Sequence, residues 1–153
     1  MYIGVKLINA EPMTRLEWCS HRGWDLPSDE NGSDEGYKVT YIDGGYVSWS
    51  PKDVFDRAYR ETSGLNFGLA IEALKMGEKV ARKGWNGKGM WLIQVPASPN
   101  IKPVAGTPYS NAGLVEKVTI DSHIDMFTAQ GSMQPGWLAS QADMLADDWE
   151  VVD

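Results

Sequence analysis

Turn-forming residues interrupt this chain at short intervals and keep its helices and strands short. Glycine supplies positive φ, proline fixes φ, and Asn and Asp bond their own backbone, so clusters of these residues favour turns. Such clusters occupy residues 25–36, 43–45, 84–89, 96–113 and 135–136. The short segments between them predict an α+β fold, in which a short antiparallel sheet is accompanied by a few short helices.

The first part of the chain carries signals for a hairpin and two helices. Thr14 and Glu17 form a capping-box pattern, which predicts a helix to about residue 22. Residues 37–42 and 46–49 flank Asp43-Gly44-Gly45, which is typical of a hairpin. We expect Ser50 to cap a second helix, with Pro51 in its first turn, and a further strand at residues 2–7.

A polar segment at residues 60–64 predicts a boundary between domains over residues 1–62 and 63–153. Beyond it, Asn66 is the expected cap of a helix that ends at Gly77. The remaining elements are expected as strands at residues 80–82, 90–95, 115–120, 124–128 and 149–152, and as a short helix at about residues 140–146.

Charge and cysteine content exclude several classes of protein. The chain has 14 basic and 21 acidic residues, a net charge of −7, so it repels phosphates and we expect no long nucleic acid as partner. Its single cysteine, Cys19, allows no disulfide framework, which favours a reducing intracellular setting. No stretch approaches the roughly 20 apolar residues of a membrane span, so no membrane partner is expected.

Familiar catalytic and metal-binding motifs are missing from the sequence. It contains no HExxH, paired CxxC, GxxxxGK[ST] or GxGxxG motif. His123 and Asp125 share a strand face and are candidates for a metal ligand pair, with an exposed polar pair as the alternative. We therefore expect no catalytic residue, no metal and no cofactor.

A local reversal of charge beside aromatic residues is the main functional signal. Residues 75–88 hold five basic residues and one acidic residue, surround Trp85 and lead into Trp91. The glycine-rich loop at residues 84–89 can bring backbone N–H groups close to a ligand. An aromatic face next to cations suits a nucleotide, since the base stacks and the phosphates take the charge. The alternative is a solvated helix end followed by a hairpin with a packed tryptophan.

A second polar and aromatic cluster follows Pro135-Gly136. It contains Trp137, Ser140, Gln141 and Asp143. Asp143 can accept a hydrogen bond from an exocyclic amine or a ribose hydroxyl, whereas capping of a short helix is the alternative role for these polar residues. Four acidic residues near the end of the chain are expected to be solvated: Asp147, Asp148, Glu150 and Asp153.

Two segments, LNFGLAIEALKMGEKVARKGWNGKGMWL and PGWLASQADMLADDWEVV, make residues 65–153 resemble the second type of phage Thoeris anti-defence protein. The resemblance implies a sponge that does not act as an enzyme. It implies binding of the cyclic ADP-ribose isomer made by a bacterial TIR-domain sensor, in the cytoplasm of the infected host. Some members also resemble sponges for the cyclic dinucleotides of CBASS defence. The family forms homotetramers with ligand pockets between subunits, so a homo-oligomer is implied here.

Carried onto this sequence, the resemblance implies a set of ligand-binding residues. The residues implied to stack on the rings of the ligand are Phe67, Trp85 and Trp137. Those implied to make polar contacts with it are Asn86, Ser140, Gln141 and Asp143. The charge of the phosphates adds Arg82, Lys83 and Lys88 as expected partners. Relative to short family members, residues 99–113 read as an insertion. Residues 1–62 resemble an extension found in other phage proteins.

Three other functions stay open at this point. An enzyme that cleaves such a nucleotide would employ His123 and Asp125. A single-stranded nucleic-acid binder would employ the same aromatic and basic residues, and its binding would fall with salt. A virion or interaction module would depend mainly on residues 1–62.

Overall fold

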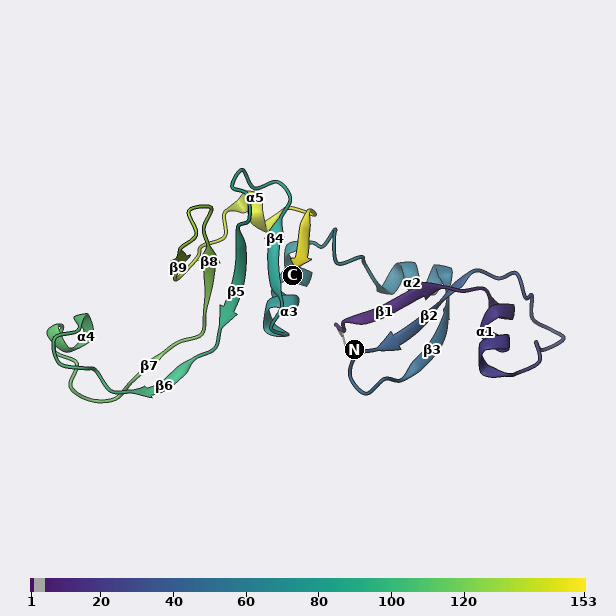
Figure 1. Ribbon diagram of the computed structural model, residues 1–153, viewed down its shortest axis with the longest axis horizontal. Helices are drawn as coiled ribbons and strands as arrows, with labels where there is room; N and C mark the ends of the chain where they lie inside the picture. The colour runs from purple at the N-terminus through teal and green to yellow at the C-terminus, as the bar shows by residue number, and fades with distance from the viewer. Residues whose placement is uncertain (2–4) are drawn as a thin grey trace. The chain divides into compact units, whose positions relative to one another are not determined.

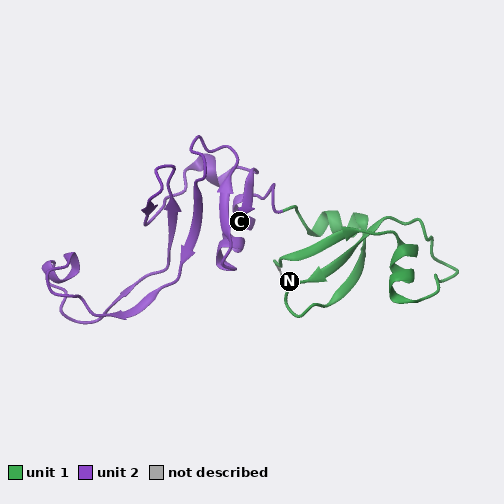
Figure 2. Ribbon diagram, viewed as in Figure 1, with its two compact units in different colours: residues 1–61 green, residues 62–153 purple. Residues whose placement is uncertain are grey.

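The described residues form three antiparallel sheets, which have three, five and two strands (Figure 1). The computed structural model describes residue 1 and residues 5–153. These divide into two units, Met1–Glu61 and Thr62–Asp153, each with its own sheet and short helices (Figure 2). The α+β class expected from the sequence is confirmed. Among the described residues, no helix has the length and apolar character needed to cross a membrane.

The first unit is built on a three-stranded sheet in the order β1-β2-β3. Trp18, Cys19 and Val39 are its buried apolar residues, and Tyr37 stacks on Phe55 of α2 with ring centroids 4.1 Å apart. The elements are β1 (Ile8–Pro12), α1 (Arg15–Arg22), β2 (Gly36–Tyr41), β3 (Val47–Pro51) and α2 (Lys52–Ala58).

Local signals in the first unit are confirmed at two places and fail at one. Thr14 and Glu17 form the expected capping box at the start of α1, and the hairpin joins β2 to β3. The expectation that Ser50 caps α2 is wrong, because Ser50 pairs with Tyr37 in the β2–β3 ladder and Pro51 takes the cap position. Of the strand expected at residues 2–7, residues 2–4 lie outside the described part, and β1 begins at Ile8.

The second unit contains a five-stranded antiparallel sheet in the order β10-β4-β5-β8-β9. Helix α3 packs on β4, β5 and β10 (Figure 1). Its elements are α3 (Phe67–Lys75), β4 (Lys79–Arg82), β5 (Trp91–Val95), β6 (Ser98–Ile101), α4 (Pro108–Asn111), β7 (Val118–Ile120), β8 (His123–Phe127), β9 (Met133–Gln134), α5 (Gln141–Met144) and β10 (Trp149–Val152).

Helix α3 and the sheet enclose the hydrophobic core of this unit. The side chain of Asn66 accepts a hydrogen bond from the Leu69 N–H at 3.0 Å, which confirms the expected cap. Small residues on the buried face of α3 bring the helix close to the sheet. The buried core consists of Leu65, Ala70, Ala73, Leu74, Val80, Leu92, Met126 and Trp149.

Backbone hydrogen bonds join the first segment of the second unit to its last strand. Leu65 and Trp149 exchange two backbone hydrogen bonds, with N···O distances of 2.7 and 3.1 Å. The Val151 N–H also donates to the carbonyl of Thr62 at 2.8 Å. The first and last segments of the unit therefore lie side by side.

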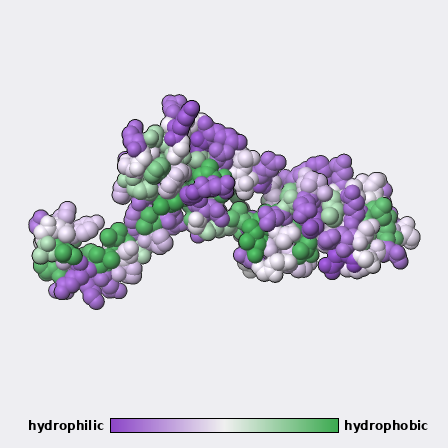
Figure 3. All heavy atoms as spheres, viewed as in Figure 1, coloured by the Kyte–Doolittle hydropathy of each residue, from purple (hydrophilic) through white to green (hydrophobic). Residues whose placement is uncertain are grey.

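Strands β6 and β7 form a two-stranded arm that carries α4 and extends from the five-stranded sheet (Figure 1). No residue from 98 to 120 is buried. Apolar side chains nevertheless gather on the arm, as the green atoms at its end show (Figure 3). Those that are exposed are Ile101, Val104, Tyr109, Leu114 and Val115.

Candidate functional site

An aromatic cluster lies where α3, the residue 84–89 loop and the segment before α5 meet the core. Trp149 is fully buried, and three half-buried rings pack around it. Phe67, Trp85 and Trp137 have their ring centroids 5.5, 5.4 and 6.1 Å from that of Trp149. The structure thus brings together the three residues expected to stack on a ligand.

The geometry of the cluster limits how a base can bind to one chain. The Trp85 and Trp137 ring centroids are 6.2 Å apart and their planes meet at 64°, so the rings contact each other edge to face. A base held between two rings needs parallel planes about 7 Å apart, twice the usual contact distance. Within one chain, a base therefore has no slot between Trp85 and Trp137.

Asp143 is a buried carboxylate beneath the cluster. Its Oδ1 accepts hydrogen bonds from Nη1 of Arg82 at 2.8 Å and Nε1 of Trp85 at 3.0 Å. Its Oδ2 accepts bonds from the backbone N and Oγ of Ser140 at 3.0 and 2.6 Å. Ser140 and Asp143 form a capping box at the start of α5, so the capping role expected as an alternative for them is confirmed.

Burial tends to raise the pKa of Asp143. The hydrogen bonds from Ser140, Arg82 and Trp85 outweigh it and lower that pKa to about 2. A carboxylate whose pKa is lower in the folded than in the unfolded chain stabilises the fold above its unfolded pKa of about 3.9. This contribution is lost as the pH falls from about 4 to about 2.

We therefore expect Asp143→Asn to destabilise the second unit at neutral pH by about 1–2 kcal/mol, after allowance for solvent screening. The difference in unfolding free energy between wild type and variant should shrink as the pH falls from about 4 to about 2. Urea unfolding of both proteins across this range measures it. A difference that stays constant over that range would contradict the pairing of Asp143 in the folded state.

Arg82 links Asp143 to the final strand. Its Nε donates to Oδ1 of Asp148 at 2.8 Å, and Oδ2 of Asp148 accepts the Gly84 N–H at 2.8 Å. The hydrogen bond from Arg82 lowers the pKa of Asp148. Asp148 and Glu150, expected to be solvated, instead face the basic stretch, with Glu150 3.7 Å from Nζ of Lys83. Strand β10 pairs with β4, and this pairing brings the two charge signs together.

The basic residues between positions 75 and 88 differ in whether their charged groups are already bonded within the chain. Arg82 is paired as described, and the Lys83 ammonium also donates to the carbonyl of Ser63 at 2.7 Å. Lys88 is exposed, and in the described part of the chain its ammonium has no hydrogen bond or ion pair. Asn86 and Gln141 are also exposed. Lys83 and Ser140 are exposed as well, but their side chains are hydrogen-bonded, so Asn86, Lys88 and Gln141 are the members of the expected polar set that combine exposure with no side-chain hydrogen bond among the described residues.

The other candidate pair, His123 and Asp125, is held together on β8. Nε2 of His123 lies 3.5 Å from Oδ1 of Asp125, and the same oxygen accepts the Gly136 N–H at 3.2 Å. Among the residues that the structure describes, no group of three or more His, Cys, Asp or Glu side chains is placed to hold a metal ion.

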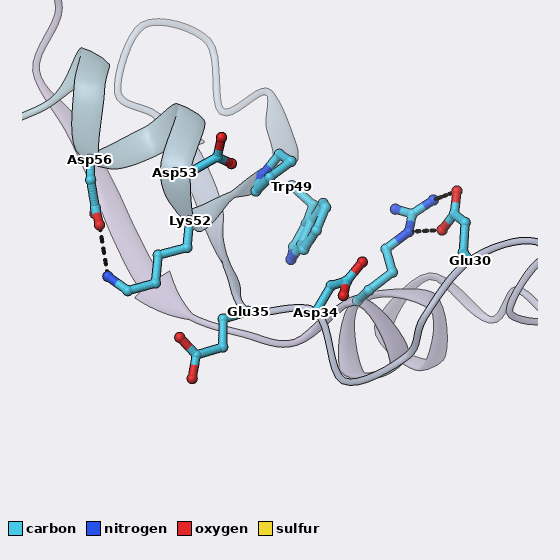
Figure 4. Close-up of a pocket in the computed structure, with 9 residues that line it drawn as sticks. Glu30, Asp34, Glu35, Trp49, Lys52, Asp53 and Asp56 are labelled. Carbon is cyan, nitrogen blue, oxygen red and sulfur yellow. Dashed lines mark hydrogen bonds and ion pairs between the residues drawn. The ribbon is translucent and has the colours of Figure 1, made fainter.

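The first unit has a hollow of about 700 Å³ beside Trp49 (Figure 4). Five carboxylates line it: Glu30, Asp34, Glu35, Asp53 and Asp56. Its two cations are already paired, Arg15 with Glu30 and Lys52 with Asp56 (Figure 4). The hollow is therefore acidic and does not suit an anionic nucleotide.

Comparison with known proteins assigns the second unit to a family. The model of the Thoeris anti-defense 2-like domain matches residues 65–152. The chain belongs to this family. It is also similar to Thoeris anti-defense 2 of Bacillus phage SP01, with 34% identity over 88 residues, which cover 58% of this chain and 94% of the relative. The aromatic cluster and its charged network lie within the Thoeris anti-defense 2-like domain.

Two residues that organise this Thoeris anti-defense 2-like domain were missed as site residues in the sequence. Trp149 is the centre of the aromatic cluster, and its Nε1 donates to the backbone carbonyl of Asp143 at 2.9 Å. Asp148 joins Arg82 to the glycine-rich loop. The alternation of Trp149 and Val151 in a strand signals an inward-facing indole, whereas no sequence pattern signals that Asp148 faces Arg82.

Proposed function

We propose that the Thoeris anti-defense 2-like domain, over residues 63–153, binds a cyclic ADP-ribose isomer and sequesters it without cleaving it. The observation that supports this proposal most is the convergence of Phe67, Trp85 and Trp137 at a glycine-rich loop that also carries Lys88, whose ammonium has no partner among the described residues. Aromatic faces suit the adenine ring, and an ammonium group with backbone N–H groups suits a pyrophosphate. Residues 1–62 are proposed as an extension whose acidic hollow serves another purpose.

Sequestration requires high affinity, because the protein must outcompete the receptor for the signal. Nanomolar binding corresponds to about −12 kcal/mol. Stacking supplies roughly 1–3 kcal/mol per base, and charge-assisted hydrogen bonds supply roughly 1.5–3 kcal/mol each. These contributions reach nanomolar affinity only when the pocket is already formed before binding.

A homotetramer with pockets between subunits is part of the proposal. One chain offers no slot for a base between Trp85 and Trp137. A second copy placed against the cluster would supply the opposite wall and exclude water from the charged contacts. This arrangement would also rigidify the loop at residues 84–89. The protein would act in the cytoplasm of the infected bacterium.

Calorimetry of the purified chain against a TIR-derived cyclic ADP-ribose isomer tests the proposal. We expect nanomolar binding, recovery of ligand of unchanged mass after heat denaturation, and a tetrameric mass in solution. Ligand of altered mass would make the protein an enzyme and direct attention to His123 and Asp125. Absence of binding would refute this ligand class, and titration of cyclic dinucleotides would then test the CBASS signals. Binding that grows with oligonucleotide length would instead favour single-stranded nucleic acid.

A further inference from the structure

The Asp143 carboxylate has no acceptor position left for a ligand. A carboxylate offers about four lone-pair positions on its two oxygens. In this structure Arg82 and Trp85 donate to Oδ1, and Ser140 donates twice to Oδ2. A ribose hydroxyl or an adenine amine would have to displace one of these donors.

The Arg82 guanidinium is similarly occupied. Its Nη1 donates to Asp143 at 2.8 Å and to the Ala142 carbonyl at 3.2 Å, and its Nε and Nη2 donate to Asp148 at 2.8 and 3.4 Å. Four of about five N–H donors are therefore engaged. The side chain is only 16% exposed, so a phosphate has little access to it.

The hydrogen bonds of Asp143 and Asp148 also fix the position of the Trp85 ring and of the glycine-rich loop. The Nε1–H of Trp85 is the only polar group of its ring, and its bond to Asp143 fixes the rotation of the indole. Asp148 holds the backbone of Gly84, where an added Cβ would lie 2.7 Å from Oδ2 of Asp148. The start of the 84–89 loop is therefore fixed by the same charges as the ring.

We infer that Asp143 and Arg82 are positioning residues, which orient the Trp85 indole and the 84–89 loop and make no contact with the ligand. The inference rests on the proposed function for the identity of that ligand. The sequence predicted that Asp143 and Arg82 contact the ligand directly, whereas here they act on it only through Trp85 and the loop. It leaves Lys88 as the cation that meets the phosphates.

Hydrogen exchange of the indole N–H groups in the ligand-free full chain tests the positioning role. Asp143→Asn removes the charge that binds Trp85, whereas Trp149 Nε1–H donates to the Asp143 backbone carbonyl and serves as an internal control. We expect exchange at Trp85 to accelerate about tenfold or more, as for loss of a charge-assisted hydrogen bond. Exchange at Trp149 should change much less. Unchanged exchange at Trp85 would overturn the positioning role.

The salt dependence of ligand binding separates positioning from contact. Arg82→Gln should weaken binding of the cyclic ADP-ribose isomer about tenfold or more by loosening the site, yet leave the salt dependence as in wild type. Lys88→Gln, the matched change of an exposed cation, should flatten the salt dependence and leave Trp85 exchange unchanged. Equal flattening in both variants would show that Arg82 contacts the phosphates.

A third substitution keeps the test decisive if Asp143→Asn prevents folding. Asp148→Asn weakens the hold on Arg82 from a carboxylate that is 33% exposed, so the fold should tolerate it. We expect it to reduce affinity with unchanged salt dependence, and a flattened dependence would count against the inference. If wild type binds no cyclic ADP-ribose isomer, the proposed function fails, while the exchange rates still decide whether Asp143 fixes Trp85.

Discussion

Replacing Trp85 by alanine is expected to weaken binding of the cyclic ADP-ribose isomer about 100-fold, because a stacking face worth about 1–3 kcal/mol is lost and Asp143 loses a donor. Trp85→Phe keeps a ring but not the N–H group, so it should weaken binding less, by about tenfold. Calorimetry of the two variants beside wild type measures both effects.

Because Trp85 lies at the edge of the core, correct folding of the Trp85→Ala variant is a necessary control. The ring is half-buried and packs against Trp149 with centroids 5.4 Å apart. Circular dichroism and the mass in solution should show that Trp85→Ala keeps its fold and assembly. If the variant unfolds, Trp85 is chiefly a core residue, and the alternative of a hairpin with a packed tryptophan is correct. Full affinity in a folded variant would remove Trp85 from the site.

Trp149→Ala is expected to have the largest effect on stability. Trp149 is fully buried, contacts three aromatic rings and closes the sheet beside Leu65. Truncation of such a side chain costs about 3–5 kcal/mol, a large share of the roughly 5–15 kcal/mol that stabilises a typical domain. Denaturant unfolding should therefore show a second unit that is unfolded or only marginally folded in this variant.

Trp24→Ala provides the matched comparison for this loss of stability. Trp24 lies in the first unit and is 54% exposed, so its removal should change the unfolding free energy by less than about 1 kcal/mol. An equally small effect for Trp149→Ala would contradict its place at the centre of the core.

Short-range signals in the sequence predicted most elements of the fold. The capping box of Thr14 and Glu17 and the cap at Asn66 depend on residues within one helical turn, so they can be identified from the sequence alone. The start of α2 could not be identified in this way. Ser50 is held in β3 by its pairing with Tyr37, a contact between distant residues that overrides local preference for a cap.

The candidate site was predicted in its aromatic part but not in its charged part. Trp85 and Trp137 stood out because large rings and turn residues occur together. The partners of Arg82 could not be deduced, since Asp148 is 66 residues away and only the β4–β10 register places it alongside. A cluster of cations in the sequence therefore overstated the positive charge that a ligand would meet.

The bridge between Leu65 and Trp149 has a consequence for how this domain can be combined with others. Because its first and last segments lie side by side, a further module joined at either end attaches at the same place on the domain. The relative from phage SP01 matches this unit over 94% of its own length, whereas the present chain has an additional folded unit before it. Adjacent ends of this kind are typical of domains that tolerate fusion to another folded unit.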